Sequence, residues 1–168
     1  MKILETERLI LRELLTEDDA EFVYALLNTP KFIKYIGDRG VTTPAAAAAF
    51  IENRYRLSYR DNGFGLYAVE RKIDSEPVGL CGFVKRETLP GPDIGFAFLP
   101  EFEGRGYGFE SADAMMKYGR DMLGFTRVLA ITSLDNAASG RLLKKLGFTF
   151  EQLIENGVET LKLFASDI

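Results

Sequence analysis

The sequence predicts an α/β domain built on a mixed sheet, and the order of its periodic segments is the main reason. Short segments in which apolar residues alternate or run unbroken are typical of strands, and longer segments with apolar residues three or four positions apart are typical of helices. Along the chain they follow in the order strand, helices, three strands, helix, strand, helix, two strands. With 168 residues, of which 46% are hydrophobic, the chain has the size of one compact domain. We therefore expect a single domain over residues 1–168.

The individual elements follow from these patterns and from the residues at their ends. The predicted strands are 9–14, 64–72, 78–84, 94–99, 127–132, 148–154 and 158–164. The predicted helices are 16–28, 44–62, 109–123 and 136–146, with a short helical turn at 31–36. Thr16 and Thr43 have N-cap chemistry, and the apolar strand 94–99 is expected to be buried on both faces. These elements predict a twisted, mostly antiparallel mixed sheet of about seven strands flanked by about four helices.

The counts of two residue types exclude several classes of protein. Cys81 is the only cysteine, so the chain has no internal disulfide and too few ligands for a cysteine zinc site. Cys81 lies in the middle of a predicted strand, where we interpret it as a small buried hydrophobe. The chain has no histidine, which rules out a Ser-His-Asp triad, a Cys-His pair and most catalytic metal sites. Proton transfer must therefore use carboxylate, hydroxyl, phenol, amine or water, and we expect no metal.

Charge and hydropathy limit the partners of the chain. The formal net charge is −4 and no basic stripe is present, so we expect no nucleic acid, whereas an amine-bearing partner is compatible. Charged residues interrupt positions 1–15, unlike a signal peptide, and no segment approaches the ~18 apolar residues of a membrane span. We therefore expect a cytoplasmic protein without membrane contact, as a monomer or a homodimer.

The segment 100–111, PEFEGRGYGFES, places Gly104, Gly106 and Gly108 between a predicted strand and a predicted helix. A glycine-rich turn at a helix start lets an anion approach free backbone N–H groups. A P-loop needs Lys and then Ser or Thr after its last glycine, whereas Phe109 stands at the next position. A dinucleotide fingerprint needs Gly or Ala at position 109 and an acidic residue after the following strand, and both are missing. The remaining alternatives are another kind of anion site and a tight turn without a ligand.

Three stretches in this order resemble the GCN5-related N-acetyltransferase (GNAT) superfamily. They are ETERLILRELLTEDDAEFVYAL at the start, DIGFAFLPEFEGRGYGFES in the middle and NAASGRLLKKLGF toward the end. Together they span nearly the whole chain and are similar to the branch that contains ribosomal-protein alanine N-acetyltransferases of the RimJ and RimL type. The resemblance implies a single GNAT-like domain that transfers an acetyl group from acetyl-coenzyme A to a primary amine.

The resemblance also implies a coenzyme A site at the glycine loop. The family's pyrophosphate motif is Gln or Arg, two residues, Gly, one residue, and Gly or Ala; Gly106 and Gly108 match it, and Glu103 stands at the Gln or Arg position. We expect the Glu103 side chain to point away while its backbone still serves. The strand 96–99 is expected to offer backbone groups to the pantetheine arm. The implied cofactor-binding residues are Phe98, Leu99, Arg105, Gly106, Tyr107, Gly108, Asn136 and Ser139.

The chemistry implied by the resemblance is attack of a neutral amine on the acetyl thioester, while a base removes a proton and an acid protonates the departing thiolate. Many family members carry a tyrosine acid at the position of Leu143. We interpret Ser139 as the substitute acid, the alternative being a hydroxyl bonded to a helix carbonyl. Asp93, working through water, is the preferred base, with Glu87 and Tyr35 as alternatives.

The absence of a visible strong base bears on the acceptor. At pH 7, an α-amine of pKa ~7.8 costs about 1 kcal/mol to deprotonate, and a lysine amine of pKa ~10.4 costs about 4.6 kcal/mol. We therefore expect the α-amine of a protein N-terminus or of an amino-acid-like small molecule, whose identity the sequence leaves open. The alternative is a catalytically silent coenzyme A-binding sensor or interaction module, in keeping with Glu103 and Leu143 at the two family positions.

Overall fold

One sheet of eight strands runs through the computed structural model, which describes residues 1–168. The strands are β1 (Lys2–Glu5), β2 (Leu9–Arg12), β3 (Leu66–Arg71), β4 (Pro77–Val84), β5 (Asp93–Phe98), β6 (Arg127–Ser133), β7 (Thr149–Glu155) and β8 (Thr160–Asp167). Their order in the sheet is β1-β2-β3-β4-β5-β6-β8-β7. All neighbours are antiparallel except β5 and β6, which are parallel. The predicted mixed, mostly antiparallel sheet is confirmed, with β1 as an additional edge strand.

The helices are α1 (Ala20–Leu27), α2 (Pro30–Tyr35), α3 (Pro44–Phe50), α4 (Leu57–Asn62), α5 (Tyr107–Asp121) and α6 (Ala137–Lys145). A π-helical stretch, η1 (Ile51–Arg56), joins α3 to α4, so 44–62 is one continuous helical segment as predicted. A single 3-10 turn, η2 (Pro100–Phe102), lies between β5 and α5. Thr43 caps α3 as predicted, because its hydroxyl accepts the Ala46 N–H at 3.0 Å. None of the helices is long and apolar enough to span a bilayer.

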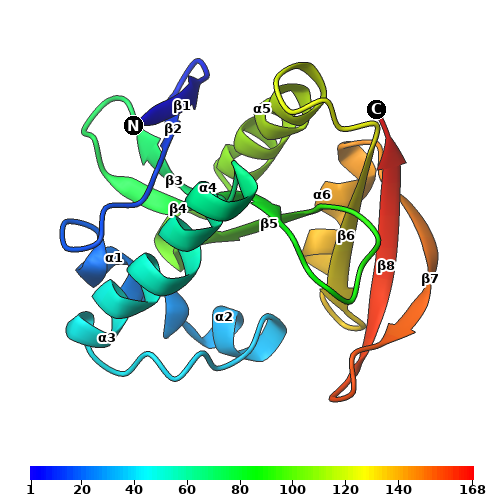
Figure 1. Ribbon diagram of the computed structural model, residues 1–168, viewed down its shortest axis with the longest axis horizontal. Helices are drawn as coiled ribbons and strands as arrows, with labels where there is room; N and C mark the ends of the chain where they lie inside the picture. Colours follow the sequence, from blue (N-terminus) through cyan, green and yellow to red (C-terminus); the bar gives the residue numbers. More distant parts are fainter.

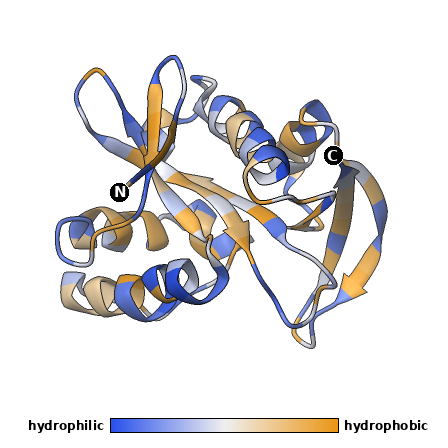
Figure 2. Ribbon diagram, turned by 45° about the horizontal axis from the view of Figure 1, so that its top comes forward, coloured by the Kyte–Doolittle hydropathy of each residue, from blue (hydrophilic) through white to orange (hydrophobic).

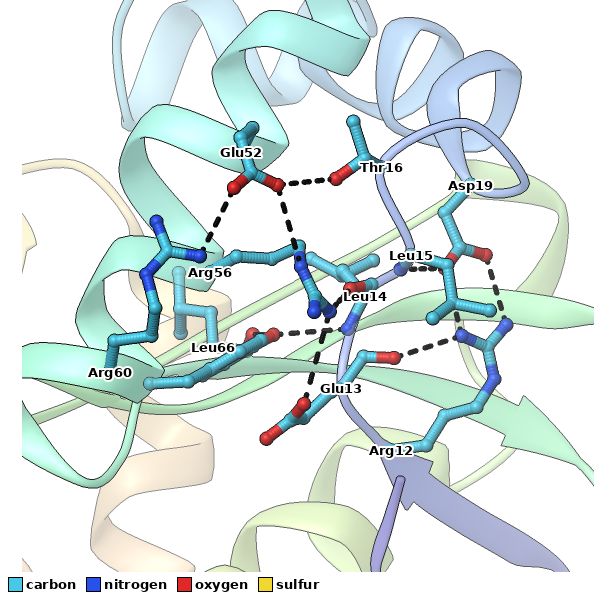
Figure 3. A network of polar contacts seen from close by, with 11 residues as sticks. Arg12, Glu13, Leu14, Leu15, Thr16, Asp19, Glu52, Arg56, Arg60 and Leu66 are labelled. Carbon is cyan, nitrogen blue, oxygen red and sulfur yellow. Dashed lines mark hydrogen bonds and ion pairs between the residues drawn. The ribbon is translucent and has the colours of Figure 1, made fainter.

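Thr16 does not cap α1, which corrects the prediction. The carboxylate of Asp19 accepts the Leu15 N–H at 2.7 Å and two hydrogen bonds from the Arg12 guanidinium, at 2.8 and 2.9 Å (Figure 3). These contacts hold the chain in a turn, so the helix begins only after Asp19. The Thr16 hydroxyl instead donates to Glu52 at 2.7 Å, which ties this turn to η1 (Figure 3).

Two apolar cores lie on opposite faces of the sheet. Alternate residues of a strand point to opposite faces, and on β3 Tyr67 and Val69 enter one core while Ala68 enters the other. The first core includes residues of α5 and α6, and the second includes residues of α1, α3 and η1. Figure 2 shows apolar residues gathered on the central strands and polar residues on the outer sides of the helices. The helices therefore form two layers, one on each face of the sheet.

The sheet opens between β5 and β6. The two strands pair only at Asp93 and Leu129, where the Leu129 N–H donates to the Pro92 carbonyl at 2.9 Å. Beyond this junction they run apart, while β8 pairs with the other edge of β6 (Figure 1). The strand β5 is buried at its first two residues and half-buried from Gly95 to Phe98. This corrects the expectation that it is buried on both faces, and the reason is the missing neighbour along its second edge.

Candidate active site

A cavity of about 1000 Å³ occupies the opening between β5 and β6 and is lined by elements from both faces of the sheet. One part of its wall comes from α5 and α6, and another from α2, η1 and α4. The predicted site residues that line it are Asp93, Phe98, Gly106, Tyr107, Gly108, Asn136 and Ser139. Leu99 and Arg105 are not part of the wall. One cavity thus joins the glycine loop to the parallel junction of the sheet.

The glycine loop presents a helix start with free amides. Gly106 is the N-cap of α5 and has a φ of 84°, a left-handed conformation that favours glycine. The backbone N–H groups of 107–109 have no acceptor in the chain, as expected in the first turn of a helix. A Cβ at Gly108 would lie 3.3 Å from Leu142 Cδ2 and 3.7 Å from Phe98 Cε2. The loop therefore sits close to β5 and α6, with the geometry of an anion site.

Arg8, which the sequence patterns do not single out, holds this loop in place. Its Nε donates to Glu110 Oε1 at 2.7 Å and its Nη1 donates to the Arg105 carbonyl at 3.0 Å. Its guanidinium carbon also lies 4.7 Å from the centre of the Tyr107 ring, a cation–π distance. The Thr6 hydroxyl donates to the second oxygen of Glu110 at 2.5 Å. Arg8 and Glu110 are 102 positions apart, so no local sequence pattern could have paired them.

Glu103 is neutralised by a lysine. Its Oε2 accepts a hydrogen bond from Lys31 Nζ on α2 at 2.6 Å, and this contact raises the pKa of Lys31. Both residues line the cavity. The Glu103 side chain is therefore turned toward α2 and its charge is paired, while its direction relative to the phosphates stays a prediction.

This pairing predicts an asymmetric response to substitution. Glu103→Gln should change the KM for acetyl-coenzyme A less than about 3-fold, because Lys31 already offsets the carboxylate charge. Lys31→Gln should raise that KM by about 3- to 5-fold, the range expected for one exposed ion pair, because it leaves a bare carboxylate near the phosphates. Steady-state kinetics checks both, and the control is Lys117→Gln, which removes the lysine of an exposed ion pair outside the cavity, 2.9 Å from Asp113. A large fall in the KM for acetyl-coenzyme A in Glu103→Gln would show instead that the carboxylate repels the phosphates despite its contact with Lys31.

Alternate residues of β5 turn their backbone groups toward the opening. The Leu99 N–H donates to the Val78 carbonyl at 2.9 Å, on the β4 side. Because the backbone groups of successive residues in a strand point to opposite edges, those of Phe96 and Phe98 face the gap beside β6. Leu99 therefore cannot offer its N–H to a ligand there, and Phe96 is the second strand residue with free backbone groups.

Asn136 and Ser139 lie together at the start of α6. Asn136 Oδ1 accepts the Ser139 N–H at 3.2 Å, so Asn136 is the N-cap of the helix. Its Nδ2 makes no hydrogen bond within the chain, and the Ser139 hydroxyl makes none to a helix carbonyl. Both side chains are half-buried in residues that line the cavity. Leu143, at the family's tyrosine position, is 1% exposed in the core.

Asp93 lies where the opening closes, at the pairing of β5 with β6. It is 1% exposed, and its two oxygens accept hydrogen bonds from Arg86 Nε at 3.1 and 3.2 Å. Burial raises the pKa of Asp93 to about 6, against the lowering effect of Arg86. A carboxylate that titrates near neutral pH is suited to taking up and releasing a proton.

The remaining candidates differ in position. Tyr35 lines the cavity, whereas Glu87 is exposed and lies outside its wall. Cys81 is buried as predicted, and burial raises the pKa of its thiol to about 12, which makes it unreactive. No group of three or more Cys, Asp or Glu side chains is placed to hold a metal ion.

The mixed sheet opens between two parallel strands, with a glycine-capped helix at the opening, and the comparisons with known proteins show that the chain is an acyltransferase. The model of the acetyltransferase (GNAT) domain matches residues 8–149, and the chain belongs to this family. It is also similar to the uncharacterized N-acetyltransferase YoaA of Bacillus subtilis, with 32% identity over 153 residues, 90% of this chain and 85% of the relative.

Solved structures with the same fold include enzymes with and without bound coenzyme A. A GNAT-family acetyltransferase from Bacillus anthracis superposes with a TM-score of 0.80 at 26% identity, covering 99% of this chain and 98% of that one. RimL, a ribosomal L7/L12 α-N-protein acetyltransferase solved with coenzyme A, superposes with a TM-score of 0.85 at 18% identity, covering 100% and 98%. A more distant sequence relative is the spermidine N(1)-acetyltransferase of Escherichia coli, with 24% identity over 82% of this chain and 71% of the relative.

Proposed function

We propose that the protein transfers an acetyl group from acetyl-coenzyme A to the α-amine of a protein N-terminus or of an amino-acid-like small molecule. The observation that carries the proposal is one cavity that joins three components: the free amides at the start of α5, the free edge of β5, and the buried carboxyl of Asp93. Family membership supports acetyl transfer in general, and the acceptor follows from the side chains of this chain.

The donor half of the cavity suits coenzyme A. The amides of 107–109 have no acceptor in the chain and would receive the pyrophosphate oxygens. The backbone groups of Phe96 and Phe98 would pair with the amides of the pantetheine arm, which need hydrogen-bond partners once they leave water. The carbonyl of Arg105 accepts a hydrogen bond from Arg8, and its exposed guanidinium, 5.5 Å from the centre of the Phe102 ring, would add positive charge near the phosphates.

Proton transfer would involve two residues of the chain. Asp93, ionised above pH 6, would take the proton of the attacking amine through water, and Arg86 would keep the carboxylate oriented. The hydroxyl of Ser139, free of any helix carbonyl, would protonate the departing thiolate. Acetyl-coenzyme A supplies the activated acetyl group, and the protein supplies position, amides and proton carriers.

The acceptor half of the cavity carries unpaired positive charge. Arg39 and Arg54 line it and make no ion pair, and Tyr55, 9% exposed, makes no hydrogen bond through its hydroxyl. Partial burial lowers the pKa of Arg39, and the neighbouring cations Arg86 and Arg54 lower it further. Guanidinium groups bind carboxylates in a two-pronged geometry. These residues support an acceptor that carries a carboxylate near its amine.

A polyamine acceptor is the second candidate, because the spermidine N(1)-acetyltransferase relative acts on one. Spermidine is a polycation, and the unpaired guanidinium groups of Arg39 and Arg54 repel a polycation that binds beside them. Asp61 and Glu159 also line the cavity without an ion-pair partner. The preference for an acidic acceptor over spermidine therefore depends on whether the acceptor binds beside the arginines or beside these carboxylates.

The test is an acceptor panel assayed by release of free thiol from acetyl-coenzyme A. The panel holds the dipeptides Ala-Glu, Ala-Gln and Ala-Lys, alanine, alanine amide and spermidine. We expect kcat/KM to be highest for the acidic acceptors, and Arg54→Gln to raise the KM for Ala-Glu while leaving that for Ala-Gln nearly unchanged. Arg60→Gln, an outward residue that pairs with Glu52 at 3.1 Å, is the control. If kcat/KM is highest for spermidine, the acceptor is a polyamine and not an α-amine. If coenzyme A binds but no acceptor causes acetyl-coenzyme A to release free thiol, the protein is a coenzyme A sensor.

A further inference from the structure

The helical segment 44–62 changes its winding in the middle. The residues that it packs into the core lie four positions apart, at Ala47, Ile51, Tyr55 and Tyr59. In an α-helix of ~3.6 residues per turn, each step of four residues goes about 40° beyond a full turn, so this row would spread over about 120°. The π-helical turn η1 winds the chain more slowly, because its hydrogen bonds span five residues rather than four. It therefore keeps the whole row facing the core.

The slower winding also brings together three side chains of the cavity wall, those of Phe50, Arg54 and Tyr55. The rings of Phe50 and Tyr55 meet edge to face, with 5.3 Å between their centroids, whereas side chains five positions apart in an α-helix point about 140° apart. The Arg54 guanidinium carbon lies 5.6 Å from the centre of the Phe50 ring, a cation–π distance. The turn thus places an arginine and a tyrosine side by side at the cavity.

The hydroxyl of Tyr55 has no hydrogen-bond partner in the chain, although the residue is only 9% exposed. Its oxygen still contacts open space, because Thr132 Oγ1 is the one fully enclosed side-chain nitrogen or oxygen that lacks a partner. Burial raises the pKa of Tyr55 to about 12, against the lowering effect of Arg39 and Arg54. The phenol is therefore protonated at neutral pH and free to donate a hydrogen bond beside two cations.

Tyr59, the next residue of the same row, shows the opposite situation. Its hydroxyl donates to the Leu66 carbonyl at 2.5 Å and accepts the Leu14 N–H at 3.1 Å. Burying a hydroxyl without a partner costs free energy, so unpaired ones are found where a ligand or water completes the site. The fold itself satisfies Tyr59, whereas only an occupant of the cavity can satisfy Tyr55.

We propose that Tyr55 is a specificity-determining residue of the acceptor site: its hydroxyl donates a hydrogen bond to the side-chain carboxylate of an acidic acceptor, beside the guanidinium groups of Arg39 and Arg54. This inference rests on the proposed function, which takes the acceptor's carboxylate to lie at these arginines. Both arginines end in long, flexible side chains, whereas a buried ring holds the Tyr55 hydroxyl in place. Tyr55 therefore fixes the direction from which the carboxylate binds.

The two tyrosines provide a matched pair of variants. Tyr55→Phe removes a hydroxyl that is unpaired in the free protein, so its melting temperature should not fall, whereas Tyr59→Phe should lower it. Tyr55→Phe should raise the KM for Ala-Glu about 3- to 10-fold and that for Ala-Gln less than about 2-fold, because a hydrogen bond to a charged group is the stronger one. Its kcat should stay unchanged. Tyr59→Phe should change both KM values by the same factor.

If Tyr55→Phe raises both KM values equally, or lowers the melting temperature as Tyr59→Phe does, the hydroxyl is structural and the inference fails. The control works because Tyr59 lies on the same helical segment and has the same side chain, but its hydroxyl is already paired within the chain.

A binding experiment separates this inference from the proposed function. The peptides N-acetyl-Ala-Glu and N-acetyl-Ala-Gln, the expected products, are titrated by calorimetry into protein saturated with coenzyme A, so no turnover is needed. Wild-type protein should bind the acidic peptide at least about 3-fold more tightly, and Tyr55→Phe should remove most of this difference. Equal affinities in the wild-type protein, an unchanged difference in Tyr55→Phe, or no binding of the acidic peptide at millimolar concentration would overturn the inference, even if the protein acetylates dipeptides. A preference that depends on Tyr55 in a protein without turnover would overturn the enzyme but keep this contact.

Discussion

Replacing Asp93 with asparagine should lower kcat about 100-fold or more, the usual contribution of a positioned general base. The amide keeps the size of the side chain but cannot take a proton. The two oxygens that now accept from Arg86 at 3.1 and 3.2 Å would become one. The KM for acetyl-coenzyme A should change little, because Asp93 lies at the closed end of the opening, away from the glycine loop. Steady-state kinetics with saturating donor measures both quantities.

The pH dependence should follow the same residue. With a pKa of about 6, Asp93 is protonated below that pH and cannot act as a base, so kcat/KM should fall steeply as the pH drops through 6. A shallower rise toward pH 8 is expected from deprotonation of an α-amine of pKa ~7.8. In Asp93→Asn the limb near pH 6 should disappear and the amine limb should remain.

Stability should move in the opposite direction to activity. The folded-state pKa of Asp93 is raised from 3.8 to about 6, so protons bind the folded state more tightly and the ionised carboxyl destabilises it as the pH rises through this range. Above pH 6 the penalty is about 3 kcal/mol, from roughly two pKa units. Asp93→Asn removes that charge, while Arg86, 36% exposed, keeps contact with water. We expect no loss of thermal stability at pH 8, and a gain of up to this amount.

Asp61→Asn is the matched control, because it removes a second carboxylate from the cavity wall, one that is exposed. It should retain near wild-type kcat and the limb near pH 6. If Asp93→Asn and Asp61→Asn behave alike, or if Asp93→Asn loses stability and activity together at pH 8, Asp93 is a structural ion-pair residue and the base lies elsewhere.

Gly106→Asp should weaken acetyl-coenzyme A binding by about 10- to 100-fold. A carboxylate beside the pyrophosphate adds a repulsion of about 1 to 4 kcal/mol per phosphate charge at 4 Å, depending on the local dielectric. The position is also narrow, because a Cβ there would lie 3.2 Å from Arg8 Nη2. Calorimetric titration with coenzyme A measures the affinity directly.

Gly124→Asp separates this effect from backbone strain. Gly124 lies just beyond the other end of α5, has a φ of 73°, and has open space around its Cβ position. Both variants put an aspartate into a left-handed conformation, so both should lose some stability, but only Gly106→Asp should lose affinity. An unchanged affinity in a folded Gly106→Asp protein would show that the pyrophosphate lies elsewhere.

The architecture was predictable because its signals are local. Alternating and continuous apolar runs marked seven strands, and Thr43 with Pro44 marked a helix start that the structure confirms. Thr16 was a misleading signal because a tertiary contact, Arg12 with Asp19, fixes the turn and delays α1. The half-exposure of β5 was missed for a similar reason, since an apolar run does not reveal that a neighbouring strand turns away.

The candidate site residues were predicted from short stretches of sequence and from a family resemblance, and the structure brings Asp93, Gly106 and Asn136 to one cavity. Gly106 and Gly108 fall in one short stretch, so their spacing and the resemblance identified the loop before the structure placed it at a helix start. Arg8 and Lys31 come from distant segments and form ion pairs with Glu110 and Glu103 next to that loop. Contacts between residues so far apart in the chain leave no local sequence pattern.

A single-turnover experiment with acetyl-coenzyme A labelled in its acetyl group tests the central claim most directly. Excess protein, labelled donor and the dipeptide Ala-Glu are mixed at pH 8, and mass spectrometry follows the label. The account predicts that the label leaves coenzyme A and appears on the α-amine of the dipeptide. Label that stays on coenzyme A bound to the protein, with every acceptor of the panel unmodified, would contradict the account and identify a coenzyme A sensor.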